Sequence, residues 1–144
     1  MEALESQMHQ GRMDMTATFD ALTHYALSPS DPHREALRAL TTQPNELTAW
    51  LETWQAEQVA SQGSQRSAAM RSANPVIIPR NHRVQEAIDA AYDGDFVPFQ
   101  TLLSVVTKPF DESVEARRLA APATETEQVL RTFCGTEGLT LKHI

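Results

Sequence analysis

The chain has 144 residues and a mass of 16.0 kDa, which is the size of one compact domain. Hydrophobic residues make up 41% and charged residues 22% of the sequence, as in ordinary soluble proteins that bury a core. The formal net charge of −7 and the isoelectric point near 5.1 argue against nucleic acid or an anionic membrane as the main partner.

Short apolar runs and a single cysteine exclude further classes of protein. The longest apolar runs, residues 76–78 and 102–106, are far shorter than the roughly 20 residues that a membrane span needs. No basic and apolar leader opens the sequence. Cys134 is the only cysteine, which excludes an internal disulfide and a cysteine-rich zinc site. We therefore expect a soluble, cytoplasmic protein.

The first half of the sequence predicts helices separated by prolines. Apolar residues recur at spacings of three and four across residues 14–27, with Asp14 near the N-terminus of that helix. A proline-rich breaker leads into a short helix that ends before Pro44. Asn45 is expected to cap a longer helix that follows. Residues 61–72 are polar and small, and they predict a weak helix or a mobile connection.

The second half opens with an extended strap, because Pro75 and Pro79 each disfavour helix at the residue before them. Asn81 is expected to cap the next helix, and Gly94 to supply the positive φ of the turn that ends it. A further helix over residues 96–107 completes an antiparallel hairpin. The inward faces of the hairpin are expected to carry Val84, Ile88, Phe99, Leu103 and Val106.

These elements together predict an all-α fold, an irregular array of about five to seven helices with the antiparallel hairpin toward its C-terminal end. No segment shows the alternation of a β-strand. We divide the single domain into N-terminal helices at residues 1–72, the proline strap plus hairpin at residues 73–112, and a poorly ordered tail with Cys134 at residues 113–144.

Few side chains offer chemistry. The five histidines include no pair at the spacing of a helical metal site. Glycine loops that bind phosphate are missing from a sequence with five glycines. Trp50 and Trp54 stand one helical turn apart, which is typical of a core or an interface. We therefore predict no catalytic, cofactor-binding or metal-binding residue in this chain.

Three residues remain as candidates for a role. Arg80 and Asn81 follow the strap and are expected to brace the structure, Arg80 through a neighbouring carboxylate and Asn81 through its cap. Cys134 is the one potential nucleophile, and Arg131 is the nearby positive charge that could activate it as a thiolate. An inert tail thiol is the alternative for Cys134 at this point.

Five blocks of sequence occur in a specific order and spacing. They are NPVIIPRNHRVQEAI from Asn74 to Ile88, Gly94 to Phe96, Leu102 with Leu103, Lys108 to Glu112, and Thr132 to Thr136. In this order they resemble the C-terminal end of the selenoprotein O family, the protein adenylyltransferases of YdiU type. The resemblance covers nearly the whole chain, yet only about the last quarter to third of a family member.

The resemblance implies a fold and an activity. The family has a protein-kinase-like (pseudokinase-like) core that transfers AMP from ATP to protein hydroxyl groups, with ATP and magnesium bound in the part that precedes this segment. No residue here matches those binding motifs. The chain would then be non-catalytic alone and would pack on that core. The apolar surface that it leaves uncovered without the core would permit self-association.

Cys134 is the one functional residue that the resemblance carries over. It matches the family's C-terminal cysteine or selenocysteine, which implies a redox-regulatory thiol that pairs reversibly with a cysteine of the kinase-like core. The sequence departs from the family pattern in three respects, one of which is that it opens at a methionine in the middle of a domain of the family protein. Residues 113–128 are rich in alanine and glutamate, and residues 137–144 extend past the usual end.

Two interpretations of other classes stay open. The chain could be an independent helical adaptor that binds proteins in grooves between its helices. It could also be a small thiol-redox protein that acts through Cys134, although the lack of a second cysteine disfavours a self-contained redox cycle.

Overall fold

A computed structural model describes residues 2–60 and 63–127 of the chain. Within these ranges the chain forms eight α-helices, one short 3-10 helix and no strand, which confirms the all-α prediction. The helices are α1 (Glu2–Gln10), α2 (Met15–Leu27), α3 (Asp31–Arg38), α4 (Pro44–Ala60), α5 (Gly63–Ala73), α6 (Asn81–Tyr92), α7 (Val97–Val106), α8 (Val114–Leu119) and η1 (Glu125–Glu127). Across the described ranges, no helix combines the length and the hydropathy that crossing a bilayer requires.

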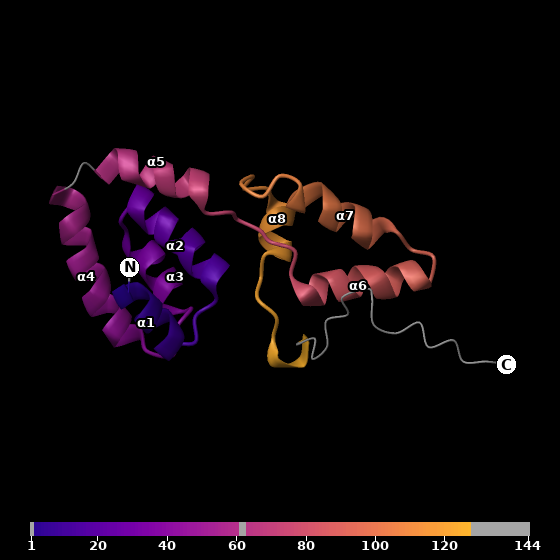
Figure 1. The fold of residues 1–144 in the computed structure, drawn as a ribbon, viewed down its shortest axis with the longest axis horizontal. Coiled ribbons are helices and arrows are strands. Elements are labelled where there is room, and N and C mark those ends of the chain that lie inside the picture. The colour runs from indigo at the N-terminus through magenta and orange to yellow at the C-terminus, as the bar shows by residue number, and fades with distance from the viewer. Residues whose placement is uncertain (1, 61–62, 128–144) are drawn as a thin grey trace.

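The helices gather into two lobes, each with its own hydrophobic core (Figure 1). Helices α1 to α5 form the N-terminal lobe. Helices α6 to α8 form the C-terminal lobe together with the strap, residues 74–80, which runs out of α5 between the lobes.

The core of the N-terminal lobe is made of side chains from its first four helices. Its buried members are Leu4, Leu22, Tyr25, Leu37, Leu47 and Leu51. Trp50 and Trp54 of α4 pack against this core with their ring centroids 5.8 Å apart, which confirms the core interpretation of their spacing. Each fully buried leucine contributes roughly 1.5–3 kcal/mol through removal from water.

Local sequence explains most helix boundaries in this lobe. Asp14, predicted to lie near the N-terminus of α2, is its N-cap, and its Oδ1 accepts a hydrogen bond from the Ala17 amide at 2.8 Å. Helix α4 begins at Pro44, so Asn45 lies inside the helix and the expected cap at Asn45 is wrong. The polar stretch after α4 contains a helix, α5, which packs against α2. The sequence pattern does not predict α1.

The strap is extended, as predicted, and it supplies the second core. Val76 and Ile77 are buried against α7 and α8. The Val76 amide donates a hydrogen bond to the Pro109 carbonyl at 2.7 Å, which fixes the strap beside the end of α7. The partners of Val76 and Ile77 in this core are Leu102, Val105, Ala116 and Leu119.

Helices α6 and α7 lie side by side and are joined by a turn in which Gly94 has a φ of 85° (Figure 1). The predicted inward faces are partly wrong: Val84 and Val106 pack against the core of the C-terminal lobe as predicted, but Ile88, Phe99 and Leu103 are exposed. Ile88 and Leu103 are 43% and 47% exposed, whereas their neighbours Ala87 and Leu102 are buried. The reason is that the strap and α8 also pack on α7 and turn Leu102, rather than Leu103, toward the core.

Two further expectations are corrected in the C-terminal lobe. Arg80 is extended and occupies the N-cap position of α6, so the helix starts at Asn81 without a side-chain cap. The poorly ordered tail expected from residue 113 contains α8, whose N-cap Ser113 accepts a hydrogen bond from the Ala116 amide at 3.1 Å. Burial of Ala116 and Leu119 against the strap stabilises this helix.

Candidate functional site

The two lobes meet at a group of charged side chains centred on Asp20 of α2. Asp20 is only 8% exposed. Its Oδ1 accepts a hydrogen bond from Nη2 of Arg71 on α5 at 2.9 Å, and its Oδ2 pairs with Nη1 of Arg117 on α8. One buried carboxylate of the N-terminal lobe therefore binds a guanidinium from each lobe.

A second carboxylate, Glu112, completes the group from the loop before α8. Its Oε1 lies 2.9 Å from Nη1 of Arg71, and its Oε2 lies 3.3 Å from Nη2 of Arg117. His24 Nε2 lies 2.7 Å from Nη2 of Arg117 and 3.4 Å from Glu112 Oε1. We call these five residues, Asp20, His24, Arg71, Glu112 and Arg117, the Asp20 cluster.

The charges in the Asp20 cluster balance one another. Burial lowers the pKa of Arg117, but the hydrogen bond and charge of Asp20 and the charge of Glu112 outweigh burial, so its pKa is raised. Arg117 therefore keeps its positive charge beside the two carboxylates. Ion pairs of this kind are strong only when both partners are present, because a lone buried charge is costly.

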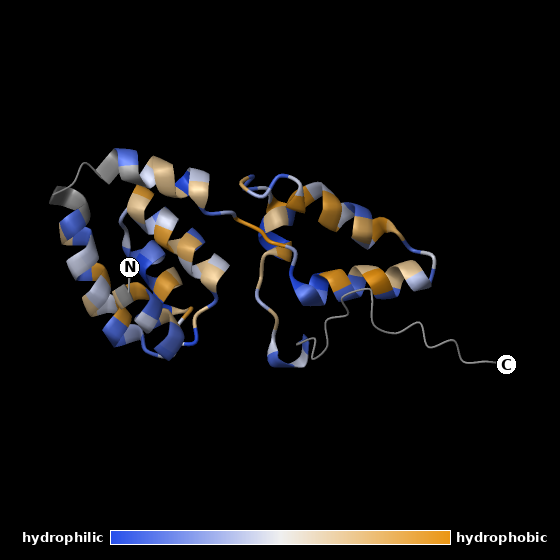
Figure 2. Cartoon of the chain, in the orientation of Figure 1, coloured by the Kyte–Doolittle hydropathy of each residue, from blue (hydrophilic) through white to orange (hydrophobic). Residues whose placement is uncertain are grey.

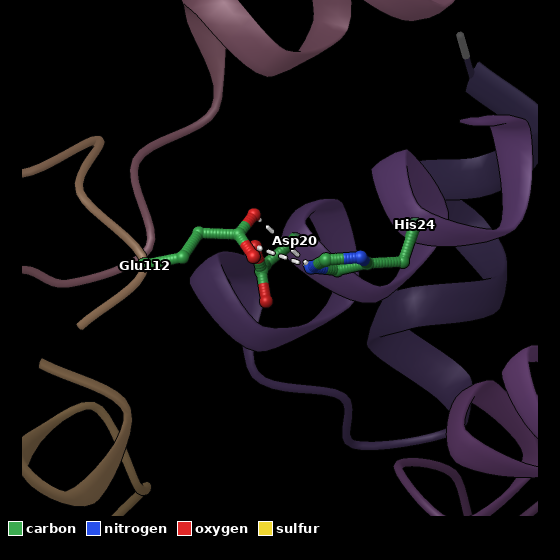
Figure 3. A group of neighbouring side chains, drawn as sticks. All are labelled: Asp20, His24 and Glu112. Carbon is green, nitrogen blue, oxygen red and sulfur yellow. Dashed lines mark ion pairs between the residues drawn. The ribbon is translucent and has the colours of Figure 1, made fainter. Parts of the chain in front are cut away.

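The Asp20 cluster offers three possible metal ligands. Figure 3 shows His24 and the carboxylates of Asp20 and Glu112 converging, with one ligand atom of each within 4.8 Å of the others. One imidazole and two carboxylates would suit a divalent metal. However, Arg71 and Arg117 pair with the same carboxylates, so a metal ion would have to displace two cations. The geometry favours an ion-pair junction between the lobes.

Arg80, one of the predicted bracing residues, forms a second junction. Its Nη1 and Nη2 donate to Oδ2 and Oδ1 of Asp14 at 2.6 and 2.8 Å, and its Nε donates to the Ala120 carbonyl at 3.2 Å. The hydrogen bond from Arg80 is the main reason that the pKa of Asp14 is lowered. Arg80 therefore connects the start of α2 to the strap and to the end of α8. Asn81, the other bracing candidate, is exposed.

A hollow of about 300 Å³ lies between α6, α7 and α8. Two arginines line it, and each pairs with a glutamate that also lines it: Arg83 with Glu86, and Arg118 with Glu115. Because these glutamates already balance the guanidinium charges, the hollow is poorly suited to the phosphates of a nucleotide.

Cys134, the predicted redox residue, and the neighbouring Arg131 lie outside the described residues.

Sequence reasoning did not identify the Asp20 cluster. Asp20 and Arg117 are 97 positions apart, so no local spacing connects them. The available signal was Asp20 itself, the only acidic residue within α2. A lone acid in a largely apolar helix indicates a buried partner of opposite charge.

Comparison with known proteins gives a consistent set of relatives. No model of a protein family matches the chain. The chain is 46% identical over 132 residues to the protein nucleotidyltransferase YdiU of Rhodopseudomonas palustris (strain BisB5). It is 41% identical over 137 residues to the protein of that name from Agrobacterium fabrum, and 41% identical over 136 residues to that from Mycobacterium sp. (strain KMS).

These alignments cover the chain and its relatives very unequally. They include 90%, 94% and 94% of this chain, but 26%, 28% and 26% of the three relatives. The chain thus spans about a quarter of the length of the curated relatives that it matches.

Proposed function

We propose that this chain is the helical C-terminal region of a selenoprotein O-like protein adenylyltransferase. The chain belongs to the YdiU family of protein nucleotidyltransferases and corresponds to a C-terminal segment of its members. The enzyme transfers AMP from ATP to protein hydroxyl groups. This region is non-catalytic alone, packs on the kinase-like core of the family and contributes a redox-regulatory cysteine.

The observation that carries the proposal is the extent of the match. Identity of 40–46% extends along about nine tenths of this chain but over only about a quarter of each relative. A match that covers about nine tenths of the chain supports a shared role for this segment within the larger protein.

ATP and magnesium are proposed as ligands of the remaining part of the family protein. Nucleotidyl transfer needs groups that cradle the phosphates and carboxylates that hold the metal. In the part of the chain that the structure describes, the carboxylates of the Asp20 cluster are already paired with Arg71 and Arg117. These residues do not fit a magnesium ion, which requires oxygen ligands in an open octahedral arrangement.

The isolated chain provides the test of the non-catalytic role. We predict no saturable binding of ATP in the micromolar range by calorimetry with magnesium present, and no transfer of labelled AMP to added proteins. The full-length Rhodopseudomonas relative serves as the positive control for both assays. Micromolar ATP binding by the 144-residue chain would overturn the proposal that catalysis belongs to the rest of the protein.

Cys134 is proposed as the redox-regulatory thiol on the basis of the sequence Thr132–Thr136. The chain has no second cysteine, so a disulfide must join Cys134 to a thiol of the core or of another molecule. The two thiols lose two electrons and two protons, and a small-molecule disulfide such as oxidised glutathione takes them up and becomes two thiols.

Mild oxidation tests this assignment. We predict that oxidised glutathione converts the isolated chain to a disulfide-linked dimer on non-reducing electrophoresis, and that the Cys134→Ser variant stays monomeric on the same gel. In the full-length context, Cys134→Ser should remove redox control of AMP transfer and leave the transfer itself in place. A Cys134 thiol that reacts with a labelling reagent only after denaturation would contradict the regulatory role.

An independent helical adaptor is the second candidate. The exposed apolar side chains of α6 and α7 are compatible with an adaptor as well as with a segment of the family protein, since a partner outside the family could cover them. The two candidates differ in one outcome: a chain that acts only as an adaptor would not support AMP transfer when it replaces the aligned segment of a family protein.

A further inference from the structure

Large apolar side chains are exposed mainly on the C-terminal lobe. Of the eleven exposed large apolar residues in the described part of the chain, six lie between residues 88 and 103. They are Ile88, Tyr92, Phe96, Val97, Phe99 and Leu103, with exposed fractions from 43% to 87%. Figure 2 shows hydrophobic colouring along both α6 and α7.

Five of these six side chains form two stripes. Ile88 and Tyr92 are four residues apart on α6. Phe96, the N-cap residue of α7, recurs with Phe99 and Leu103 of α7 at spacings of three and four, so each set lies on one side of its helix. The stripes converge on the turn that joins the two helices. We call these five residues the α6–α7 surface.

The location of the α6–α7 surface leaves it uncovered by the N-terminal lobe, as far as residues 2–60 and 63–127 show. The turn between α6 and α7 lies at the end of the C-terminal lobe farthest from the N-terminal lobe (Figure 1). Both junctions between the lobes, at Asp20 and at Arg80, lie at the opposite end. Packing of the two lobes therefore does not cover the α6–α7 surface.

The charge around this surface has one sign. Residues 84–107 contain four acidic residues, Glu86, Asp89, Asp93 and Asp95, and no lysine or arginine. Glu86 pairs with Arg83, whereas the aspartates form no ion pair with a basic side chain within the described residues. A complementary partner surface is therefore apolar at its centre and basic at its edge.

We propose that the α6–α7 surface docks on the remaining part of the same family protein, at an apolar patch edged by lysines and arginines. This inference rests on the proposed function. We infer this partner from the length of the relatives. The aligned segment makes up only 26–28% of each relative, so most of each relative is available to cover a surface of this size. Aromatic side chains at its centre suit a tight interface.

Hydroxyl-radical footprinting tests the docking directly. The experiment compares the isolated 144-residue chain with a full-length hybrid, in which this chain replaces the aligned segment of the Rhodopseudomonas relative. We predict that Tyr92, Phe96 and Phe99 are oxidised roughly tenfold more slowly in the hybrid, as expected for the buried centre of an interface. Met15 and Val114, which are exposed on α2 and α8, are the matched controls and should keep their rates.

Variants of the hybrid separate docking from folding. Leu103→Asp should restore oxidation of Phe96 to nearly the rate in the isolated chain, and Asp93→Lys should restore part of it by reversing a charge at the edge. Val114→Asp, an equally polar change elsewhere, should leave Phe96 protected.

The other outcomes of the footprinting experiment contradict either the docking site or the proposed function. A hybrid that transfers AMP while Tyr92, Phe96 and Phe99 stay fully oxidised overturns the docking site but not the proposed function. A hybrid without AMP transfer contradicts the proposed function and the docking with it. Protection that already occurs in the isolated chain and rises with its concentration would assign the surface to a second copy and overturn the proposal.

Discussion

At the scale of single residues, Asp14 combines two roles. It caps α2 and accepts two hydrogen bonds from Arg80. Its pKa is lowered chiefly by Arg80 and also by the amides of Ala17 and Thr16, against the effect of burial. Because the folded-state pKa lies below the unfolded value of about 3.9, this stabilisation is fully present above about pH 4 and is lost as the pH falls through the folded-state pKa.

We predict that Arg80→Ala lowers the free energy of unfolding by roughly 1.5–3 kcal/mol at neutral pH, as expected for charged hydrogen bonds of a half-buried carboxylate. The difference from wild type should shrink as Asp14 becomes protonated in both states, and the part that comes from the hydrogen bond of Arg80 to the Ala120 carbonyl should remain. Urea unfolding at neutral and strongly acid pH measures it. Arg118→Ala, which breaks an exposed ion pair with Glu115, is the control and should change stability little. Equal losses for Arg80→Ala at both pH values would contradict the role of the Asp14 charge.

At the scale of helices, α7 distinguishes two neighbouring leucines. Leu102 is buried in the core of the C-terminal lobe, whereas Leu103 is about half exposed. We predict that Leu102→Ala costs roughly 2–5 kcal/mol of unfolding free energy, and that Leu103→Ala costs less than about 1 kcal/mol. Thermal or urea unfolding of the two variants measures both free energies. A larger loss of unfolding free energy for Leu103→Ala would show that α7 turns Leu103, rather than Leu102, toward the core.

The same helices show what the sequence could and could not predict. Spacing of apolar residues and the positions of prolines predicted α2, α6, α7 and the strap, because these signals are local. The rotation of α7 was not predictable, since it depends on packing by Ile77 and by α8, which lie outside the helix. The Asp20 cluster was missed because its members come from separate elements; Asp20 alone signals a buried partner, but nothing local in the sequence says which residue that partner is.

At the scale of the whole molecule, the Asp20 cluster holds the lobes together. We predict that Asp20→Asn lowers the free energy of unfolding by roughly 3–5 kcal/mol, because Arg71 and Arg117 would lose their common buried carboxylate. Glu115→Gln, which removes an exposed carboxylate of the C-terminal lobe, is the control. Hydrogen exchange of α5 and α8 should also accelerate in Asp20→Asn. An unchanged exchange rate and stability would mean that the lobes are held by other contacts.

The central claim is that this chain acts as the C-terminal region of a YdiU-type nucleotidyltransferase. The most direct test is the rate of AMP transfer from labelled ATP by three proteins: the full-length Rhodopseudomonas relative, the same protein without the aligned segment, and the hybrid that carries this chain in its place. We predict that removal of the segment abolishes or strongly reduces AMP transfer. The hybrid should recover AMP transfer to within about tenfold of the parent rate, which corresponds to about 1.4 kcal/mol in the activation barrier. A hybrid that is no more active than the shortened protein would contradict the claim.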